Sequence, residues 1–160
     1  MTKALGMSAL VVGLALGASP ALALDVSRSI DVDAAPEKVW AVIGGFCGIA
    51  SWHPVVKGCQ ESNEGGKDVR LLTLDGGGLL KEQLVSRDEA GMGYTYTILE
   101  GPLPVQNYQS TIAVKPGGAG STIVWQGSFD AKGAPDAEAT SVIAGIYDAG
   151  LKTIAKEAKR

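Results

Sequence analysis

Two titratable side chains in the middle of the chain have types and surroundings suited to acid–base chemistry. His53 is the only histidine, and imidazole is the side chain whose ordinary pKa lies near neutrality. Glu82 lies in the alternating segment Leu79–Arg87, where it shares a face with Leu80 and Leu84. Burial of that face would raise the pKa of Glu82, so that both groups titrate near working pH. Both are therefore candidate catalytic residues and candidate ligand-orienting residues.

Each of the two also has an ordinary structural interpretation. Glu82 suits an edge carboxylate in solvent, and His53 suits a structural histidine that follows a short helix. The sequence shows no nucleophilic triad and no cluster of metal ligands, and Gly76–Gly78 lacks the Lys-Ser/Thr that follows a phosphate-binding loop. We therefore predict no cofactor and no metal, and we favour a binding protein over an enzyme.

A second strand face brings two hydroxyl groups among apolar side chains. Tyr108 and Ser110 share this face with Ile112 and Val114. We expect their hydroxyls to point inward and to meet Glu82 across a cavity. The alternative is a core tyrosine with a satisfied hydroxyl and a strand serine bonded to the backbone.

Two apolar residues complete the predicted ligand-binding set. Leu103 lies between two prolines in the segment Gly101–Val105, which predicts a stiff loop suited to an entrance lid or to a rigid strand connector. Trp52 is expected in the core beside the short helices, where it would also form cavity wall.

The two cysteines, Cys47 and Cys59, lie twelve residues apart. A single pair of thiols in an oxidising compartment most simply forms a disulfide. The spacing matches no common zinc pattern, and with His53 it supplies at most three ligands. We therefore predict a disulfide rather than a metal site or a catalytic thiol.

The first 23 residues are organised like a secretory signal peptide. Lys3 precedes the apolar run Ala4–Ala18, and a small-x-small sequence ends at Ala23. Because a bilayer span needs about 20 apolar residues, an N-terminal anchor is the less favoured alternative. We predict cleavage after Ala23, a single domain over residues 24–160 without a further membrane span, and a periplasmic or secreted location.

The composition suits one globular domain, because 46% of the 160 residues are hydrophobic and 19% are charged. The formal net charge of −3 gives no general basic surface for nucleic acid. The chain has 22 glycines, roughly twice the usual share of ~7%, without the three-residue period of collagen. The expected partner is a small molecule or another protein, and the glycines are expected in turns.

The order of elements follows from hydrophobic period and turn residues. Alternation predicts a first strand over Val26–Val32, and Pro36 marks the start of a short helix. A second short helical segment is expected around Cys47–Trp52, ending before Pro54. Six strands joined as antiparallel hairpins are then predicted. They cover Val55–Glu61, Asp68–Leu74, Leu79–Arg87, Gly93–Glu100, Asn107–Lys115 and Ser121–Asp130.

The last segment returns to a helical period. Apolar side chains recur on one face from Ile143 to Ile154, with acidic residues before this stripe and Lys156 and Arg160 at its end. Such a helix must bury its stripe against the sheet. The sequence predicts an α+β fold: a seven-stranded antiparallel sheet wrapped around a long C-terminal helix, with two short helices after the first strand.

This order of elements, together with the segment Ile30–Trp40, resembles the START/Bet v 1-like superfamily (SRPBCC), also called the polyketide cyclase/dehydrase and lipid-transport group. The resemblance covers residues 24–160. Trp52-His53-Pro54 and Tyr147–Leu151 resemble the exported branch that includes the methanol-oxidation accessory protein of methylotrophs. The superfamily implies a helix-grip fold with a cavity that commonly holds an apolar ligand.

A second likeness is to the plant abscisic acid receptors of the same superfamily. Glu82-Gln83-Leu84 resembles their Glu-x-Leu strand, and Asn107–Ser110 resembles the strand after their latch loop. Their carboxylate-binding lysine falls at or near Trp52, so their hormone specificity is not expected here. By this resemblance the polar cavity residues are Glu82, Tyr108 and Ser110, and the gate and latch loops are Gly76–Leu80 and Gly101–Val105.

Three hypotheses of function follow. The preferred one is an exported protein that encloses a small hydrophobic or amphipathic molecule. The second is an enzyme of the cyclase, dehydratase or isomerase type that uses His53 and Glu82. The third is an accessory protein that docks on a periplasmic oxidoreductase through an outer apolar patch.

Overall fold

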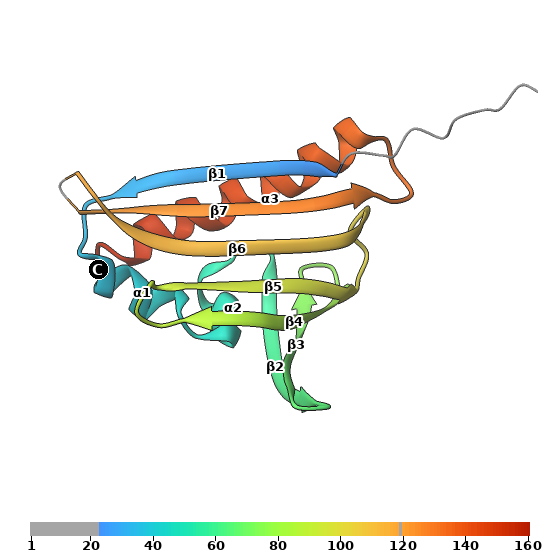
Figure 1. Ribbon diagram of the computed structural model, residues 1–160, viewed down its shortest axis with the longest axis horizontal. Coiled ribbons are helices and arrows are strands. Elements are labelled where there is room, and N and C mark those ends of the chain that lie inside the picture. Colours follow the sequence, from blue (N-terminus) through green and yellow to red (C-terminus); the bar gives the residue numbers. More distant parts are fainter. Residues whose placement is uncertain (1–22, 119) are drawn as a thin grey trace, which may run out of the picture.

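One antiparallel sheet and one long helix make up most of the protein in this computed structural model, which describes residues 23–118 and 120–160 (Figure 1). Every strand predicted from alternation is present, with ends within a few residues of those expected. The strands are β1 (Leu24–Val32), β2 (Val56–Glu64), β3 (Lys67–Leu74), β4 (Leu79–Asp88), β5 (Gly93–Glu100), β6 (Val105–Gly117) and β7 (Gly120–Ala131).

The strands form a single seven-stranded sheet in the order β1-β7-β6-β5-β4-β3-β2. The chain starts at one edge, crosses to the opposite edge and returns by successive hairpins, so that its first and last strands pair with each other. At the turn from β3 to β4, Gly76 and Gly77 have φ angles of 85° and 88°. This backbone conformation favours glycine, and the turn sets the pairing of Arg70 with Glu82 in the hairpin.

Short helices connect β1 to β2. Helix α1 (Pro36–Ile43) begins at a proline, which is preorganised for the first helical position, and buries Val39 and Ile43. The expected second segment consists of two pieces, a 3₁₀ turn η1 (Phe46–Gly48) and a single α-helical turn α2 (Ile49–Trp52). A disulfide between Cys47 and Cys59 joins this segment to β2, as predicted.

Helix α3 (Asp136–Glu157) runs along one face of the sheet (Figure 1). The predicted apolar stripe is buried, with Tyr147 and Ile154 fully enclosed. Gly150 lies where the helix comes closest to its neighbours: a Cβ placed there would be 2.7 Å from Trp125 Cζ3 and 2.9 Å from His53 Cδ2. The helix-grip α+β fold predicted from the sequence is confirmed.

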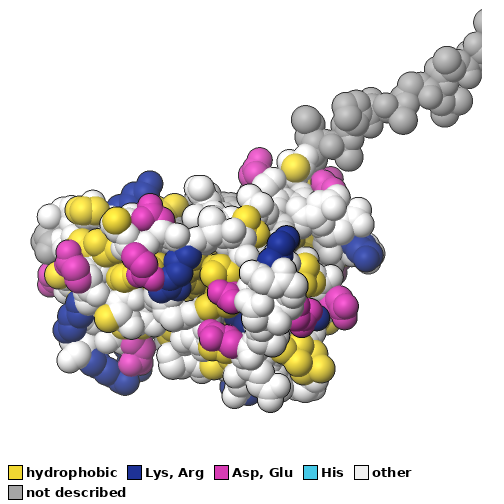
Figure 2. Space-filling view, turned by 60° about the horizontal axis from the view of Figure 1, so that its bottom comes forward, with side chains coloured by type: hydrophobic (Ala, Val, Ile, Leu, Met, Phe, Trp, Pro, Cys, Tyr) yellow, Lys and Arg dark blue, Asp and Glu magenta, His cyan; other side chains and the backbone are white. Residues whose placement is uncertain are grey.

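On the face in Figure 2, acidic and basic side chains are interspersed with small apolar areas. Among the helices of the described residues, none is long and apolar enough to cross a membrane. The predicted signal peptide lies almost wholly outside the described residues, which begin at Ala23.

Candidate ligand cavity

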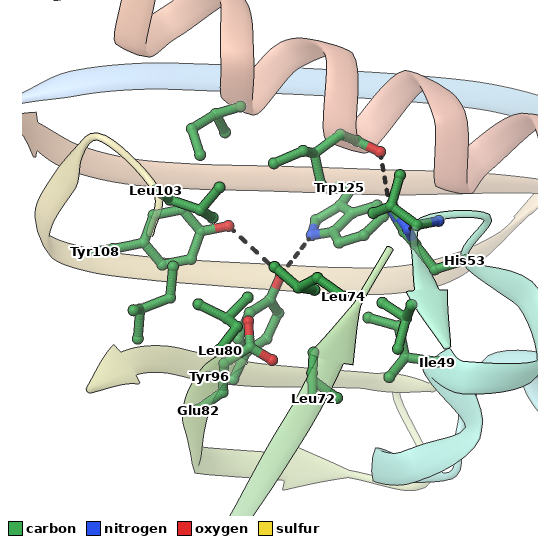
Figure 3. A pocket seen from close by; sticks show the side chains of 15 residues that line it. Ile49, His53, Leu72, Leu74, Leu80, Glu82, Tyr96, Leu103, Tyr108 and Trp125 are labelled. Carbon is green, nitrogen blue, oxygen red and sulfur yellow. Dashed lines mark hydrogen bonds between the residues drawn. The ribbon is translucent and has the colours of Figure 1, made fainter. Parts of the chain in front are cut away.

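A partly open cavity of about 70 Å³ lies between the sheet, α2 and α3 (Figure 3). A site for one water needs only about 10–15 Å³, whereas pockets for drug-sized ligands have about 300–1,000 Å³. The wall is predominantly apolar. Its residues are Ile49, His53, Val55, Val56, Leu72, Leu74, Leu80, Glu82, Tyr96, Ile98, Leu103, Tyr108, Trp125, Ile143 and Ile146.

Strand alternation places much of the wall, because side chains two residues apart on β3, β4 and β5 face the cavity. Two loops meet at one end of the cavity. The Gly76–Gly78 turn approaches the loop of residues 101–104, since a Cβ at Gly78 would lie 3.7 Å from Pro102 Cγ. Leu103 of that loop lines the cavity.

The one carboxylate of the wall is paired with a buried arginine. Glu82 is 4% exposed and Arg70 is fully buried, and Glu82 Oε2 accepts a hydrogen bond of 2.6 Å from Arg70 Nε. Burial raises the pKa of Glu82, and the guanidinium opposes that shift. Burial alone would lower the pKa of Arg70, but the neighbouring carboxylate raises it, so the arginine stays charged.

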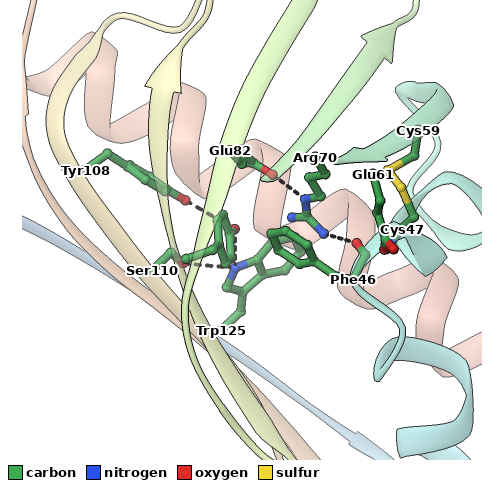
Figure 4. Close-up of polar contacts among 10 residues, drawn as sticks. Phe46, Cys47, Cys59, Glu61, Arg70, Glu82, Tyr108, Ser110 and Trp125 are labelled. Atoms are coloured by element: carbon green, nitrogen blue, oxygen red, sulfur yellow. Dashed lines mark hydrogen bonds and ion pairs between the residues drawn. A yellow bond between two sulfur atoms is a disulfide. The ribbon is translucent and has the colours of Figure 1, made fainter. Parts of the chain in front are cut away.

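The rest of the guanidinium is held by the short helical segment (Figure 4). Nη1 of Arg70 donates to the backbone carbonyl of Phe46. The guanidinium carbon lies 4.2 Å from the centre of the Phe46 ring and 5.1 Å from that of Tyr96, distances at which aromatic faces stabilise cations. Its Nη2 has no hydrogen-bond partner among the described residues. The positive charge of Arg70 thus balances the negative charge of Glu82 from a position outside the cavity lining.

His53 lies at the opposite side of the cavity and is held through both ring nitrogens. Nε2 lies 3.1 Å from the carbonyl oxygen of Ile146, and Nδ1 lies 3.4 Å from the backbone nitrogen of Val55. Because a carbonyl accepts and an N–H donates, Nε2 carries the proton and Nδ1 accepts. Burial lowers the pKa of His53, the Ile146 carbonyl opposes the shift, and the Arg70 charge lowers it further. The neutral ring is therefore the stable form.

A cluster of hydroxyls and one indole lies at the middle of the sheet. The Tyr147 hydroxyl is 2.7 Å from that of Tyr108 and 2.8 Å from Ser110 Oγ. Trp125 Nε1 donates to both Ser110 Oγ and the Tyr96 hydroxyl, each at 3.1 Å. Gly127 makes room for this cluster, because a Cβ there would be 2.3 Å from the Tyr147 hydroxyl.

Comparison with known proteins identifies the family of this chain. Residues 23–159 match the family described as polyketide cyclase/dehydrase and lipid transport. The chain belongs to this family.

Solved structures agree with the family assignment. A protein named XoxI from Bacillus cereus is 36% identical, with a TM-score of 0.78 over 82% of this chain and 93% of that one. An uncharacterised protein from Bacillus thuringiensis is 34% identical, with a TM-score of 0.80 over 86% of this chain and 100% of that one. The ZhuI aromatase/cyclase of Streptomyces sp. R1128 shares the fold at 21% identity, with a TM-score of 0.71 over 87% of this chain and 95% of that one. The comparison with curated proteins gives no match.

Four of the six predicted ligand-binding residues line the cavity of this polyketide cyclase/dehydrase and lipid-transport family member. The other two, Trp52 and Ser110, are buried but lie outside the lining set. The expectation that Tyr108 and Ser110 meet Glu82 is wrong, because their hydroxyls bond to Tyr147 instead. The four lining residues are His53, Glu82, Leu103 and Tyr108.

Sequence reasoning missed Arg70, Tyr96 and Tyr147. A signal for Arg70 was present in the β3–β4 hairpin. A tight turn centred at Gly76 places position 70 opposite position 82, the observed register, and Arg70 shares its strand face with the inward Leu72. Tyr147 belongs to the apolar stripe predicted for α3, but the bonding of its hydroxyl depends on the packing of α3 against β6 and β7.

The observed contacts restrict the acid–base chemistry available here. His53 has both nitrogens engaged, and Glu82 shares one oxygen with Arg70. Within the described residues no group of three or more His, Cys, Asp or Glu is placed to hold a metal ion. The arrangement is suited to enclosing an apolar molecule and to bonding its polar end.

Proposed function

We propose that this protein is exported and binds a small hydrophobic or amphipathic molecule in the cavity between the sheet and α3. The carrying observation is the predominantly apolar wall with its few polar groups. Apolar cavities with a few convergent polar groups are the usual form of small-molecule sites. The family description, which includes lipid transport, supports the same class of function.

The size of the cavity bears on how a ligand enters. At about 70 Å³, the cavity is about half the ~150 Å³ of an apolar cavity that holds benzene, so even a single-ring ligand requires the end of the cavity to widen. The Gly76–Gly78 turn and the loop of residues 101–104 meet there. Movement of these two loops would lengthen the cavity without disturbing the paired strands.

Export rests on two features of different kinds. The sequence of residues 1–23 has the organisation of a cleaved leader. The disulfide between Cys47 and Cys59 is of a type that persists in oxidising compartments. Cell fractionation followed by N-terminal sequencing of the product tests this part, with Leu24 as the expected first residue.

Binding is tested with toluene, a purely apolar single-ring probe. Methyl chemical shifts of the isotope-labelled protein are followed by NMR during titration. We expect saturable shifts at the wall residues Ile49, Ile98, Leu103, Ile143 and Ile146, because these surround the cavity.

The control pair separates filling of the cavity from added hydrophobicity. Ile98→Phe places extra volume inside the wall and should weaken toluene binding at least fivefold. Val85→Phe adds a ring at a position that is 48% exposed and should leave it unchanged. An absence of saturable shifts in the wild type, or equal effects of the two substitutions, would contradict the proposal.

A further inference from the structure

The hydrogen bonds of the hydroxyl cluster have a fixed direction of donation, because the acceptor at one end is a backbone carbonyl. Ser110 Oγ lies 2.9 Å from the carbonyl oxygen of Gln126, which can only accept, so the serine proton is donated there. The Tyr147 hydroxyl, 2.8 Å from the same Oγ, must then donate to the serine. The Tyr108 hydroxyl in turn donates to Tyr147 at 2.7 Å. The order of donation runs from the cavity wall toward the backbone of β7.

Tyr96 lies at the start of this chain, and its proton has only one long hydrogen bond within the described structure. Its hydroxyl oxygen accepts from Trp125 Nε1 at 3.1 Å. Its nearest acceptor, the Tyr108 hydroxyl, is 3.5 Å away, longer than the usual 2.5–3.0 Å of such bonds. Burial raises the pKa of Tyr96 well above its ordinary value, so the proton stays on the oxygen. Tyr96 therefore presents a hydrogen-bond donor at the cavity wall.

Glu82 presents the complementary acceptor. Oε2 is bonded to Arg70, and no described residue donates a hydrogen bond to Oε1. Glu82 pairs with Ile98 on β5, two residues from Tyr96, and all three line the cavity. Figure 3 shows the Glu82 carboxylate beside the Tyr96 ring, on the same side of the cavity. One donor and one acceptor thus lie on the same side of a predominantly apolar wall.

We infer that the cavity selects a neutral apolar molecule carrying a hydroxyl group, such as a phenol or an alcohol, and rejects carboxylates. This inference rests on the proposed binding function. The ligand hydroxyl donates its proton to Glu82 Oε1 and accepts the proton of Tyr96. A single hydroxyl is both donor and acceptor, so it satisfies both wall groups at once.

The charges near the cavity explain the rejection of acids. The lining residues of the described structure include a carboxylate and no lysine or arginine. The nearby cation, Arg70, is already bonded to Glu82 and to the Phe46 carbonyl. A carboxylate ligand would therefore meet Glu82 without a free counter-charge, which disfavours burial of a second negative group.

Three single-ring probes of similar size test the inference: phenol, toluene and benzoate, titrated separately at pH 7 and followed by the NMR shifts of the wall methyl groups. We expect phenol to bind at least about fivefold more tightly than toluene, because the hydrogen bonds of its hydroxyl add to the binding free energy. Benzoate should bind more weakly than either. Phenol binding no tighter than toluene, or benzoate binding as tightly as phenol, overturns the inference.

Tyr96→Phe removes the proposed donor, while Trp125 Nε1 keeps its bond to Ser110. We expect this variant to lose most of the preference for phenol over toluene while toluene binding persists. Thr95→Val is the control, because it also removes one hydroxyl from β5, at a neighbouring residue that does not line the cavity and whose hydroxyl bonds to Thr111. It should keep the preference.

The outcomes distinguish the two levels of the proposal. If no probe shifts the wall methyl groups, binding itself fails and the inference falls with it. If toluene and phenol bind equally, or if Tyr96→Phe keeps the preference for phenol, the cavity still binds apolar molecules and only the selection of a hydroxyl is overturned.

Discussion

Arg70 and Glu82 set the electrostatic character of the cavity. A buried carboxylate without a partner is strongly disfavoured, and its usual response is to take up a proton. Here the 2.6 Å contact with Arg70 supplies the opposing charge, and the arginine is itself held by Phe46 and the Tyr96 ring. The pair lets a polar atom face the cavity while keeping the local charge balanced.

Removing the arginine alone should destabilise the fold strongly. We expect Arg70→Met to lower the free energy of unfolding by about 3–5 kcal/mol, because it leaves Glu82 buried without its counter-ion. The double variant Arg70→Met, Glu82→Leu should recover most of that loss, since an apolar pair of similar volume needs no charge balance. Urea unfolding followed by circular dichroism measures both.

Arg28→Met is the matched control for this prediction. Arg28 pairs with Asp148 at 3.2 Å, but both side chains are more than 40% exposed. An exposed pair contributes about 0–1 kcal/mol, so the control should change stability little. A loss of under 1 kcal/mol for Arg70→Met would show that the buried pair is not the stabilising element described here.

At the scale of elements, α3 depends on one small residue for its position. Gly150 lets the helix approach Trp125 and His53, which both belong to the cavity wall. A helix interior otherwise favours alanine over glycine by about 1 kcal/mol. The close packing must therefore outweigh the backbone preference at this position.

Two glycines of the same helix allow a matched test. We expect Gly150→Ala to destabilise the protein, because its Cβ would lie 2.7 Å from Trp125 and the two cannot both keep their positions. Gly145→Ala should stabilise it by about 0.5–1 kcal/mol, because nothing lies within 4 Å of the added Cβ. Thermal unfolding of the two variants compares them, and stabilisation by Gly150→Ala would refute the close-approach role.

The elements show what sequence reasoning can and cannot supply. The period of two residues from 55 to 130 predicted the strands, and the stripe from Ile143 to Ile154 predicted α3, because local burial patterns decide both. The inward direction of Glu82 followed from the same alternation. Its partner could be deduced only by combining that pattern with a hairpin register. The bonds of Tyr108 to Tyr147 involve the helix packing angle, which local pattern does not encode.

At the scale of the whole molecule, few titratable groups make the stability of the fold depend on pH. His53 is the only histidine, so it is the only side chain of the unfolded chain with an ordinary pKa close to 6.5. It joins α2 to α3 through the Ile146 carbonyl. The groups near it include Arg70, whose charge disfavours the imidazolium, and Glu82 across the same cavity.

We expect global stability to fall as pH drops below about 6.5, and His53 to be the cause. Burial holds the folded-state pKa of His53 below the value of 6.5 for the unfolded chain. Within that window the unfolded state binds more protons, so stability is fully present above pH 6.5 and is lost progressively below it. Glu82 acts in the opposite direction at lower pH, because its folded-state pKa is raised above 4.5. Urea unfolding midpoints at pH 7.5 and pH 5.5 measure the net change. His53→Gln, whose amide can still donate to Ile146, should abolish the decrease, and an equal decrease in that variant would assign it to other groups.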